Sequence, residues 1–147
     1  MPGLSALLVD SVGKKVAFLE TAIAATGLGG RVSAAAARAE SLAGDPRHRE
    51  RWPAVTARAV GALAELVELA FPLLRPGGCL VAWKRGAIDR ELAIGGRAVD
   101  ALGGGRIDVQ EIRAGGLEGH RLVIATKARR TPAGYPRDPA ERRRRPW

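Results

Sequence analysis

The sequence of 147 residues predicts an α/β fold with a mostly parallel, doubly wound sheet and an antiparallel edge. Short apolar runs typical of buried strands alternate with segments whose apolar residues recur at helical spacing, which is the pattern of parallel sheets covered by helices. The first run, residues 5–10, ends on the carboxylate of Asp10 directly before a helix. The last two runs follow one another without a helix between them, which predicts an antiparallel pair at the edge of the sheet.

The first half of the chain contains three predicted strands. Its predicted elements are, in order, a strand at 5–10, a helix at about 13–26, a strand at 31–35, a short helical turn at 38–40 and a strand at 54–57. The helix is predicted because Val16, Leu19 and Ile23 recur at helical spacing, and the glycine-rich residues 27–30 end it. A polar, proline-containing excursion at 44–53 precedes the third strand.

The second half supplies two helices and the closing strands. Its predicted elements are a helix around 63–70, a strand at 79–83, a helix at 88–102 and strands at 106–112 and 122–126. Pro72 ends the first of these helices, and the sequence Arg-Pro-Gly-Gly at 75–78 predicts a turn before the strand. Three glycines at 103–105 close the second helix.

Composition bounds the class of protein. A hydrophobic fraction of 46% with 27% charged residues is typical of one soluble domain, and no apolar stretch reaches the roughly 18 residues of a membrane span, so we expect a cytoplasmic protein. One cysteine and two separate histidines predict no internal disulfide, no catalytic nucleophile and no metal site. An oligomer is not expected.

The positive charge is concentrated at the end of the chain. Residues 127–147 hold eight basic and two acidic residues, and so six of the nine net positive charges. Because four prolines interrupt this segment, we expect a domain at 1–127 and a basic tail at 128–147 that does not pack as a core element. Such a charge density favours binding to nucleic acid, although a solubilising tail or a membrane contact would have the same composition.

Several short motifs resemble, in order, those of the small-subunit ribosomal RNA methyltransferase G family, also called glucose-inhibited division protein B. These motifs are Leu-Val-Asp-Ser-Val-Gly-Lys-Lys-Val-Ala-Phe-Leu at 8–19, Arg-Ala-Glu at 38–40, Thr-Ala-Arg-Ala-Val at 56–60, Leu-Arg-Pro-Gly-Gly at 74–78, Val-Ala-Trp-Lys at 81–84 and Thr-Pro-Ala-Gly-Tyr-Pro-Arg at 131–137. Their order and spacing over almost the whole chain make the resemblance specific.

The resemblance implies a Rossmann-like fold of S-adenosylmethionine-dependent methyltransferases and an enzyme that forms 7-methylguanosine in 16S rRNA of the small ribosomal subunit. It places Asp10 at the ribose hydroxyls of the cofactor, Ala39 and Glu40 at the adenosine end, and Arg58 in the cofactor site. The expected RNA contacts are Lys84, Arg85, Arg129, Arg130 and Arg137. Methyl transfer to a ring nitrogen with a free lone pair needs positioning rather than a general base, which agrees with a sequence that has no His or Cys constellation.

The sequence departs from the family at its beginning. The family carries an N-terminal helical segment and then a first strand with a glycine-rich loop, and we expect both to be missing here. In the methyltransferase sheet that strand lies between the second and the fourth, so its loss leaves unpaired backbone and a gap in the core. It also removes the loop that holds the methionine half of the cofactor.

Each site residue also has a purely structural interpretation. Asp10 is able to cap the following helix, and Glu40 is able to be a solvated helix residue. Arg58 ends a predicted buried strand, where a lone charge is costly, and so favours a function more clearly. Two other functions stay open at this point: a truncated, non-catalytic remnant that binds RNA through its tail, and a fragment that needs a partner chain to supply the missing strand.

Overall fold

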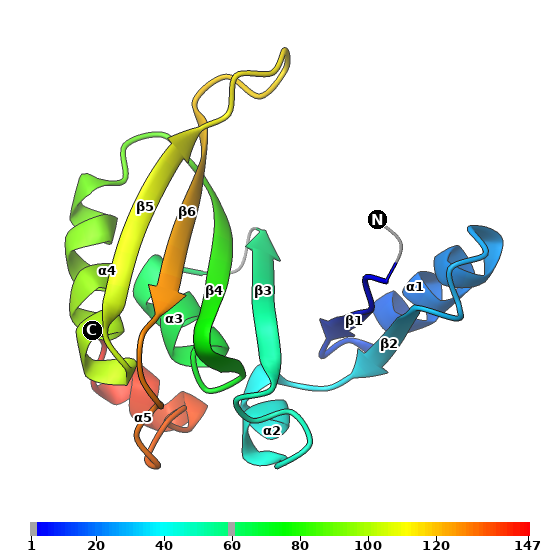
Figure 1. Cartoon of the computed structure of the whole chain (residues 1–147), viewed down its shortest axis with the longest axis horizontal. Helices are drawn as coiled ribbons and strands as arrows, with labels where there is room; N and C mark the ends of the chain where they lie inside the picture. Colours follow the sequence, from blue (N-terminus) through cyan, green and yellow to red (C-terminus); the bar gives the residue numbers. More distant parts are fainter. Residues whose placement is uncertain (1–2, 59–60) are drawn as a thin grey trace. The chain divides into compact units, whose positions relative to one another are not determined.

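The computed structural model describes residues 3–58 and 61–147 (Figure 1). The chain divides into two compact units, Met1–Leu42 and Ala43–Trp147. The described strands of the first unit form a two-stranded sheet, and those of the second unit form a four-stranded sheet.

The first unit is a strand–helix–strand element. Its elements are β1 (Ala6–Asp10), α1 (Gly13–Ala25), β2 (Val32–Ala36) and the beginning of α2 (Ala39–Gly44). β2 pairs in parallel with β1, so that Asp10 lies opposite Ala36. α1 buries Val16 and half-buries Leu19 and Ile23, which confirms the apolar face predicted from their spacing.

The second unit carries the larger sheet, with strand order β3-β4-β6-β5. Its elements are β3 (Trp52–Arg58), α3 (Leu63–Ala70), β4 (Leu74–Arg85), α4 (Asp89–Leu102), β5 (Gly105–Glu111), β6 (His120–Lys127) and α5 (Pro139–Arg144). β3 and β4 are parallel, whereas β4 with β6 and β6 with β5 are antiparallel. The α/β class and the antiparallel edge are confirmed.

The strands differ from the predicted single sheet in one respect. β1 pairs only with β2, and β3 only with β4, so no described strand joins β1 to β3 by hydrogen bonds. That a strand between them is missing stays a prediction. Each of β1 and β3 is therefore an edge strand of its own sheet.

The core of the second unit lies between its sheet and two helices. Figure 1 shows α3 and α4 on the same face of the four-stranded sheet. Alternate strand residues face these helices because successive side chains of a strand point to opposite faces. The fully buried members of this core include Leu63, Val67, Phe71, Leu74, Leu80, Ala82, Ala98, Leu102, Val123 and Ala125.

The tail packs against this core, so the expectation that residues 128–147 stay outside it is wrong. Thr131 is buried, and Tyr135 and Trp147 pack against the hydrophobic cluster. Asp138 caps α5 by accepting hydrogen bonds from the backbone N–H groups of Ala140 and Glu141. The segment is therefore folded onto the second unit, and composition alone did not reveal the aromatic and charged partners that hold it.

Two adjacent glycines of α4 give a direct test of this packing. A Cβ atom at Gly95 would lie 2.5 Å from Cδ2 of Leu63 and 2.8 Å from its Cγ, whereas a Cβ atom at Gly96 would meet no atom within 4 Å. We therefore expect Gly95→Ala to lower the free energy of unfolding by about 1–3 kcal/mol through overpacking. Gly96→Ala should raise it by up to about 1 kcal/mol through helix propensity, measured for both by urea denaturation. Equal stabilities of the two variants would contradict close packing of α3 on α4.

Candidate functional site

Three of the predicted cofactor residues lie at one edge of the first unit. Asp10 ends β1, and the backbone N–H of Ala37, directly after β2, donates to the carbonyl of Asp10 at 3.1 Å. Ala39 and Glu40 then begin α2. Because β1 and β2 run in the same direction, their carboxyl ends meet at this edge, where ligands of open α/β sheets bind.

Asp10 is an ionised, accessible carboxylate. Its Oδ1 accepts a hydrogen bond of 2.8 Å from the backbone N–H of Val12, and its Oδ2 lies 3.3 Å from Nζ of Lys15. The bond from Val12 and the neighbouring lysine hold the pKa of Asp10 below its ordinary value. A hollow of about 370 Å³ is lined by Asp10, Lys14, Lys15, Phe18 and Leu19. The carboxylate thus orders the turn before α1 and also lines an open surface.

Arg58 lies at the carboxyl end of β3 in the second unit, opposite Trp83 of β4. Its guanidinium stands 5.7 Å from the centroid of the Trp83 ring. The residue is exposed, because β3 is an edge strand whose alternate residues face outward, so the argument from a buried lone charge is wrong. Ala59 and Val60, the last residues of the motif at 56–60, lie outside the described residues.

Lys84 makes internal contacts and does not face solvent as a free cation. Its side chain is only 12% exposed, and its Nζ donates to Oε1 of Glu91 at 2.5 Å and to the carbonyl of Gly61 at 2.8 Å. The same carboxylate oxygen accepts from the backbone N–H of Leu63 at 2.6 Å, at the start of α3. Lys84 and Glu91 together bind Gly61 and Leu63, at the start of α3. The sequence analysis missed this role of Glu91.

The other predicted RNA contacts differ in accessibility. Arg85 and Arg129 are exposed, and the side chain of Arg130 is 87% exposed although its Nε lies 3.6 Å from Oε2 of Glu50. Arg137 is different, because its side chain is 14% exposed and its Nη2 lies 2.6 Å from Oε2 of the buried Glu68. Arg137 is thus an internal partner of Glu68, and its contact with RNA stays a prediction.

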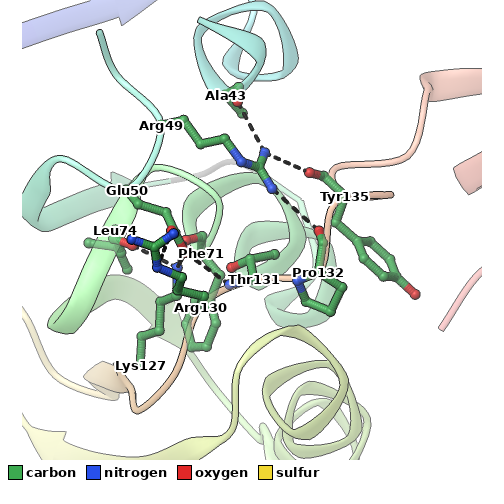
Figure 2. Close-up of polar contacts among 10 residues, drawn as sticks. All are labelled: Ala43, Arg49, Glu50, Phe71, Leu74, Lys127, Arg130, Thr131, Pro132 and Tyr135. Carbon is green, nitrogen blue, oxygen red and sulfur yellow. Dashed lines mark hydrogen bonds and ion pairs between the residues drawn. The ribbon is translucent and has the colours of Figure 1, made fainter. Parts of the chain in front are cut away.

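Figure 2 shows a second set of contacts that the sequence analysis missed, around Lys127, Glu50 and Arg49. The fully buried ammonium of Lys127 donates to Oε1 of Glu50 at 2.8 Å, and Glu50 also accepts from the backbone N–H of Thr131 at 2.9 Å. Arg49 donates from Nη1 to the carbonyl of Tyr135 at 2.9 Å. The alternation of strand residues could have predicted this burial, because Lys127 lies on the same core face of β6 as Val123 and Ala125. The sequence analysis instead counts Lys127 among the surface charges.

The chain matches the family model described as rRNA small subunit methyltransferase G over residues 1–116. The chain belongs to this methyltransferase G family. Three curated relatives carry the name ribosomal RNA small subunit methyltransferase G. The protein of Roseiflexus castenholzii is 46% identical over 92% of this chain, that of Deinococcus deserti 45% over 88%, and that of Rubrobacter xylanophilus 41% over 99%. The chain spans 58%, 53% and 57% of the length of these three relatives.

Solved structures confirm the predicted fold of this chain. An S-adenosylmethionine-dependent O-methyltransferase from Thermotoga maritima matches 87% of the chain with a TM-score of 0.63 at 12% identity, and 52% of that protein is covered. An O-methyltransferase family protein from Burkholderia thailandensis matches 87% with a TM-score of 0.59 at 17% identity, and 45% of it is covered. At these identities the likeness shows the Rossmann-like methyltransferase fold alone. Among the described residues, no helix is long and apolar enough to cross a membrane.

Proposed function

We propose that this chain carries part of a cytoplasmic enzyme that transfers a methyl group from S-adenosylmethionine to N7 of a guanosine in 16S rRNA. The family match over residues 1–116 carries the proposal, because this range includes Asp10, Ala39, Glu40 and Arg58. Support also comes from the carboxyl edge of β1 and β2, where Asp10, Ala39 and Glu40 follow neighbouring parallel strands. That Arg58 shares a pocket with these three residues stays a prediction.

The residues of the first unit fit the cofactor. A ribose diol needs an ionised acceptor that solvent can reach, and the Asp10 carboxylate, with its lowered pKa, lines an open hollow of about 370 Å³. When bound, S-adenosylmethionine supplies an electrophilic methyl group. The exposed guanidinium of Arg58 lies over the Trp83 ring, and its donors are able to bind a carboxylate or a phosphate.

The chain's own groups would act by positioning. N7 of guanine carries a lone pair and no proton, so no side chain has to remove a proton before the attack. The expected work of the protein is to align the acceptor nitrogen with the methyl group and to hold the RNA so that the base is reachable. We assign the RNA contact to the exposed Arg85, Arg129 and Arg130. Lys84 acts as a positioning residue for the start of α3, through Gly61 and Glu91.

Calorimetry with S-adenosylhomocysteine on the 147-residue chain tests the cofactor part of this proposal. We expect Asp10→Asn to weaken binding by about tenfold or more, because hydrogen bonds to a charged acceptor are stronger than those to a neutral one. Asp45→Asn is the matched control, since Oδ1 of Asp45 accepts from the backbone N–H of Arg47 at 2.8 Å in the same turn geometry as Asp10. An equal loss in both variants would mean that Asp10 acts only on its turn.

The enzymatic part is tested by transfer of a tritiated methyl group from S-adenosylmethionine to 16S rRNA. We expect the RNA to be labelled by the wild type and by Asp45→Asn, and the amount of label to fall with Asp10→Asn. Salt-dependent binding to 16S rRNA with neither cofactor binding nor transfer would instead support the second candidate, a non-catalytic RNA-binding protein. The exposed arginines of the tail are the observation that favours this alternative.

A further inference from the structure

A buried carboxylate anchors the tail at four points. Glu68 is fully buried in α3, and its Oε1 accepts from the backbone N–H and from Nε of Arg137, both at 2.9 Å. Its Oε2 accepts from Nη2 of Arg137 at 2.6 Å and from Nε1 of Trp147 at 2.7 Å. One helix residue of the core thus binds the tail both before and after α5. We call Glu68, Arg137 and Trp147 the tail clamp.

Aromatic stacking closes the clamp. The Arg137 guanidinium lies 5.0 Å from the centroid of the Trp147 ring and 5.8 Å from that of Tyr135, and these two rings stack at 6.2 Å. Nη1 of Arg137 donates to the carbonyl of Arg145 at 2.8 Å, which ties the end of α5 back to its beginning. Both ends of α5 are therefore fixed to the second unit.

The clamp leaves three consecutive arginines accessible. Arg143, Arg144 and Arg145 are exposed at the carboxyl-terminal end of α5, beside a hollow of about 310 Å³ lined by Glu141, Arg144 and Arg145. Arg143 and Arg144 are successive residues of α5, so their side chains are turned by about 100° from each other, and Arg145 follows the helix with non-helical backbone angles. One cation in the last turn is enough to complement the helix dipole, so the dipole does not account for three consecutive arginines.

We propose that Arg143, Arg144 and Arg145 form a preorganised docking surface for the phosphates of RNA, and that the tail clamp holds this surface in place. Guanidinium groups bind phosphate oxygens in pairs of hydrogen bonds. Fixing the backbone of the tail during folding removes an ordering cost that a flexible tail would meet at the moment of binding. The choice of RNA as partner rests on the proposed function, and it specifies which part of the chain grips that substrate.

RNA fits this surface better than a lipid membrane does. A helix that lies in a membrane interface needs large apolar side chains opposite its cationic face. α5 has the sequence Pro-Ala-Glu-Arg-Arg-Arg and offers none, and the nearby Trp147 ring packs against the protein core. The surface is therefore suited to a polyanion that remains in water.

Fluorescence anisotropy with labelled 16S rRNA measures the role of the arginines. The triple variant R143Q/R144Q/R145Q is expected to bind about tenfold more weakly at low salt, and the slope of log K against log salt should fall by about 2–3. The control R75Q/R90Q/R97Q removes the same charge from exposed sites elsewhere in the second unit and should change affinity much less. Equal losses in both variants would overturn the proposal, as would tighter binding to phosphatidylglycerol vesicles than to the RNA.

The clamp is tested without removing any cation. Trp147→Phe keeps an aromatic ring beside Tyr135 and removes the indole N–H that donates to Glu68. We expect RNA affinity to fall by about two- to fivefold with an unchanged salt slope, because the same phosphates are contacted by a less ordered tail. An unchanged affinity would refute the role of the clamp. Both assays measure RNA binding alone. Their results therefore do not depend on whether the chain binds the cofactor or transfers a methyl group, and the two proposals can fail separately.

Discussion

Replacing Lys127 by methionine is expected to lower the free energy of unfolding by about 3–5 kcal/mol. The buried ammonium donates to Glu50 at 2.8 Å and to the backbone carbonyls of Phe71 and Leu74, both at 2.7 Å. Methionine keeps much of the volume but removes the buried ammonium that donates to the carboxylate and to both carbonyl oxygens, and leaves Glu50 with the exposed Arg130 at 3.6 Å as its ion partner. Guanidinium denaturation followed by circular dichroism measures the change.

A double-mutant cycle with Glu50→Gln separates the ion pair from the other losses. Because the amide oxygen introduced by Glu50→Gln would still accept from the backbone N–H of Thr131, the double variant should be more stable than the sum of the single effects predicts, by about 1 kcal/mol or more. Lys14→Met, at an exposed position of α1, controls for the removal of a lysine and should have little effect. Strict additivity of the two single changes would show that Lys127 and Glu50 do not stabilise the fold as a pair.

Local periodicity was enough to place most elements of this fold. The predicted strand at 31–35 is β2 (Val32–Ala36), and the predicted helix at 88–102 is α4 (Asp89–Leu102). In both, the apolar pattern is set by which face of the element is buried, and this information lies within about a dozen neighbouring residues. The antiparallel edge was likewise visible, because no helix separates the last two apolar runs.

β4 shows where local signals are overruled. The sequence Arg-Pro-Gly-Gly at 75–78 predicts a turn, yet β4 runs from Leu74 to Arg85. Its pairing with β3 shifts register between Trp52 and Ala54, and a Cβ atom at Gly78 would lie 2.9 Å from the carbonyl oxygen of Pro53. The glycine therefore permits a close approach of two strands, which a local sequence pattern does not distinguish from a turn.

The charged contacts could not be predicted from the sequence because the two partners of each contact are distant along the chain. Glu68 and Arg137 are 69 residues apart, and Glu50 and Lys127 are 77 apart. Charge counting therefore treated the tail as a solvated polyelectrolyte, whereas Arg137 and Lys127 are internal groups of the fold. For the candidate site, the family motifs gave Asp10, Ala39 and Glu40, and the parallel pairing of β1 and β2 explains why they share one edge.

Glu68→Gln is expected to lower the free energy of unfolding by about 3 kcal/mol at neutral pH. The substitution keeps the shape of the side chain but removes the charge that Arg137 faces at 2.6 Å, in a helix position with no exposure to water. The amide also cannot accept from all the donors that Glu68 serves, which are the backbone and guanidinium N–H groups of Arg137 and the Trp147 indole. Urea denaturation measures the loss, with Glu65→Ala, an exposed acidic residue of the same helix, as the control.

The pH dependence of this loss identifies its cause. Burial by itself raises the pKa of Glu68, but the hydrogen bonds from Arg137 and Trp147 outweigh burial and hold the pKa below its ordinary value of 4.5. A carboxyl group whose pKa is lower in the folded chain stabilises the fold above its unfolded pKa and loses that contribution as the pH falls through the folded pKa. The stability difference between the wild type and Glu68→Gln should therefore stay constant at neutral pH and shrink below about pH 4.5. A difference that persisted undiminished in acid would assign the effect to packing, because glutamine does not titrate and only the ionised glutamate forms the pair with Arg137.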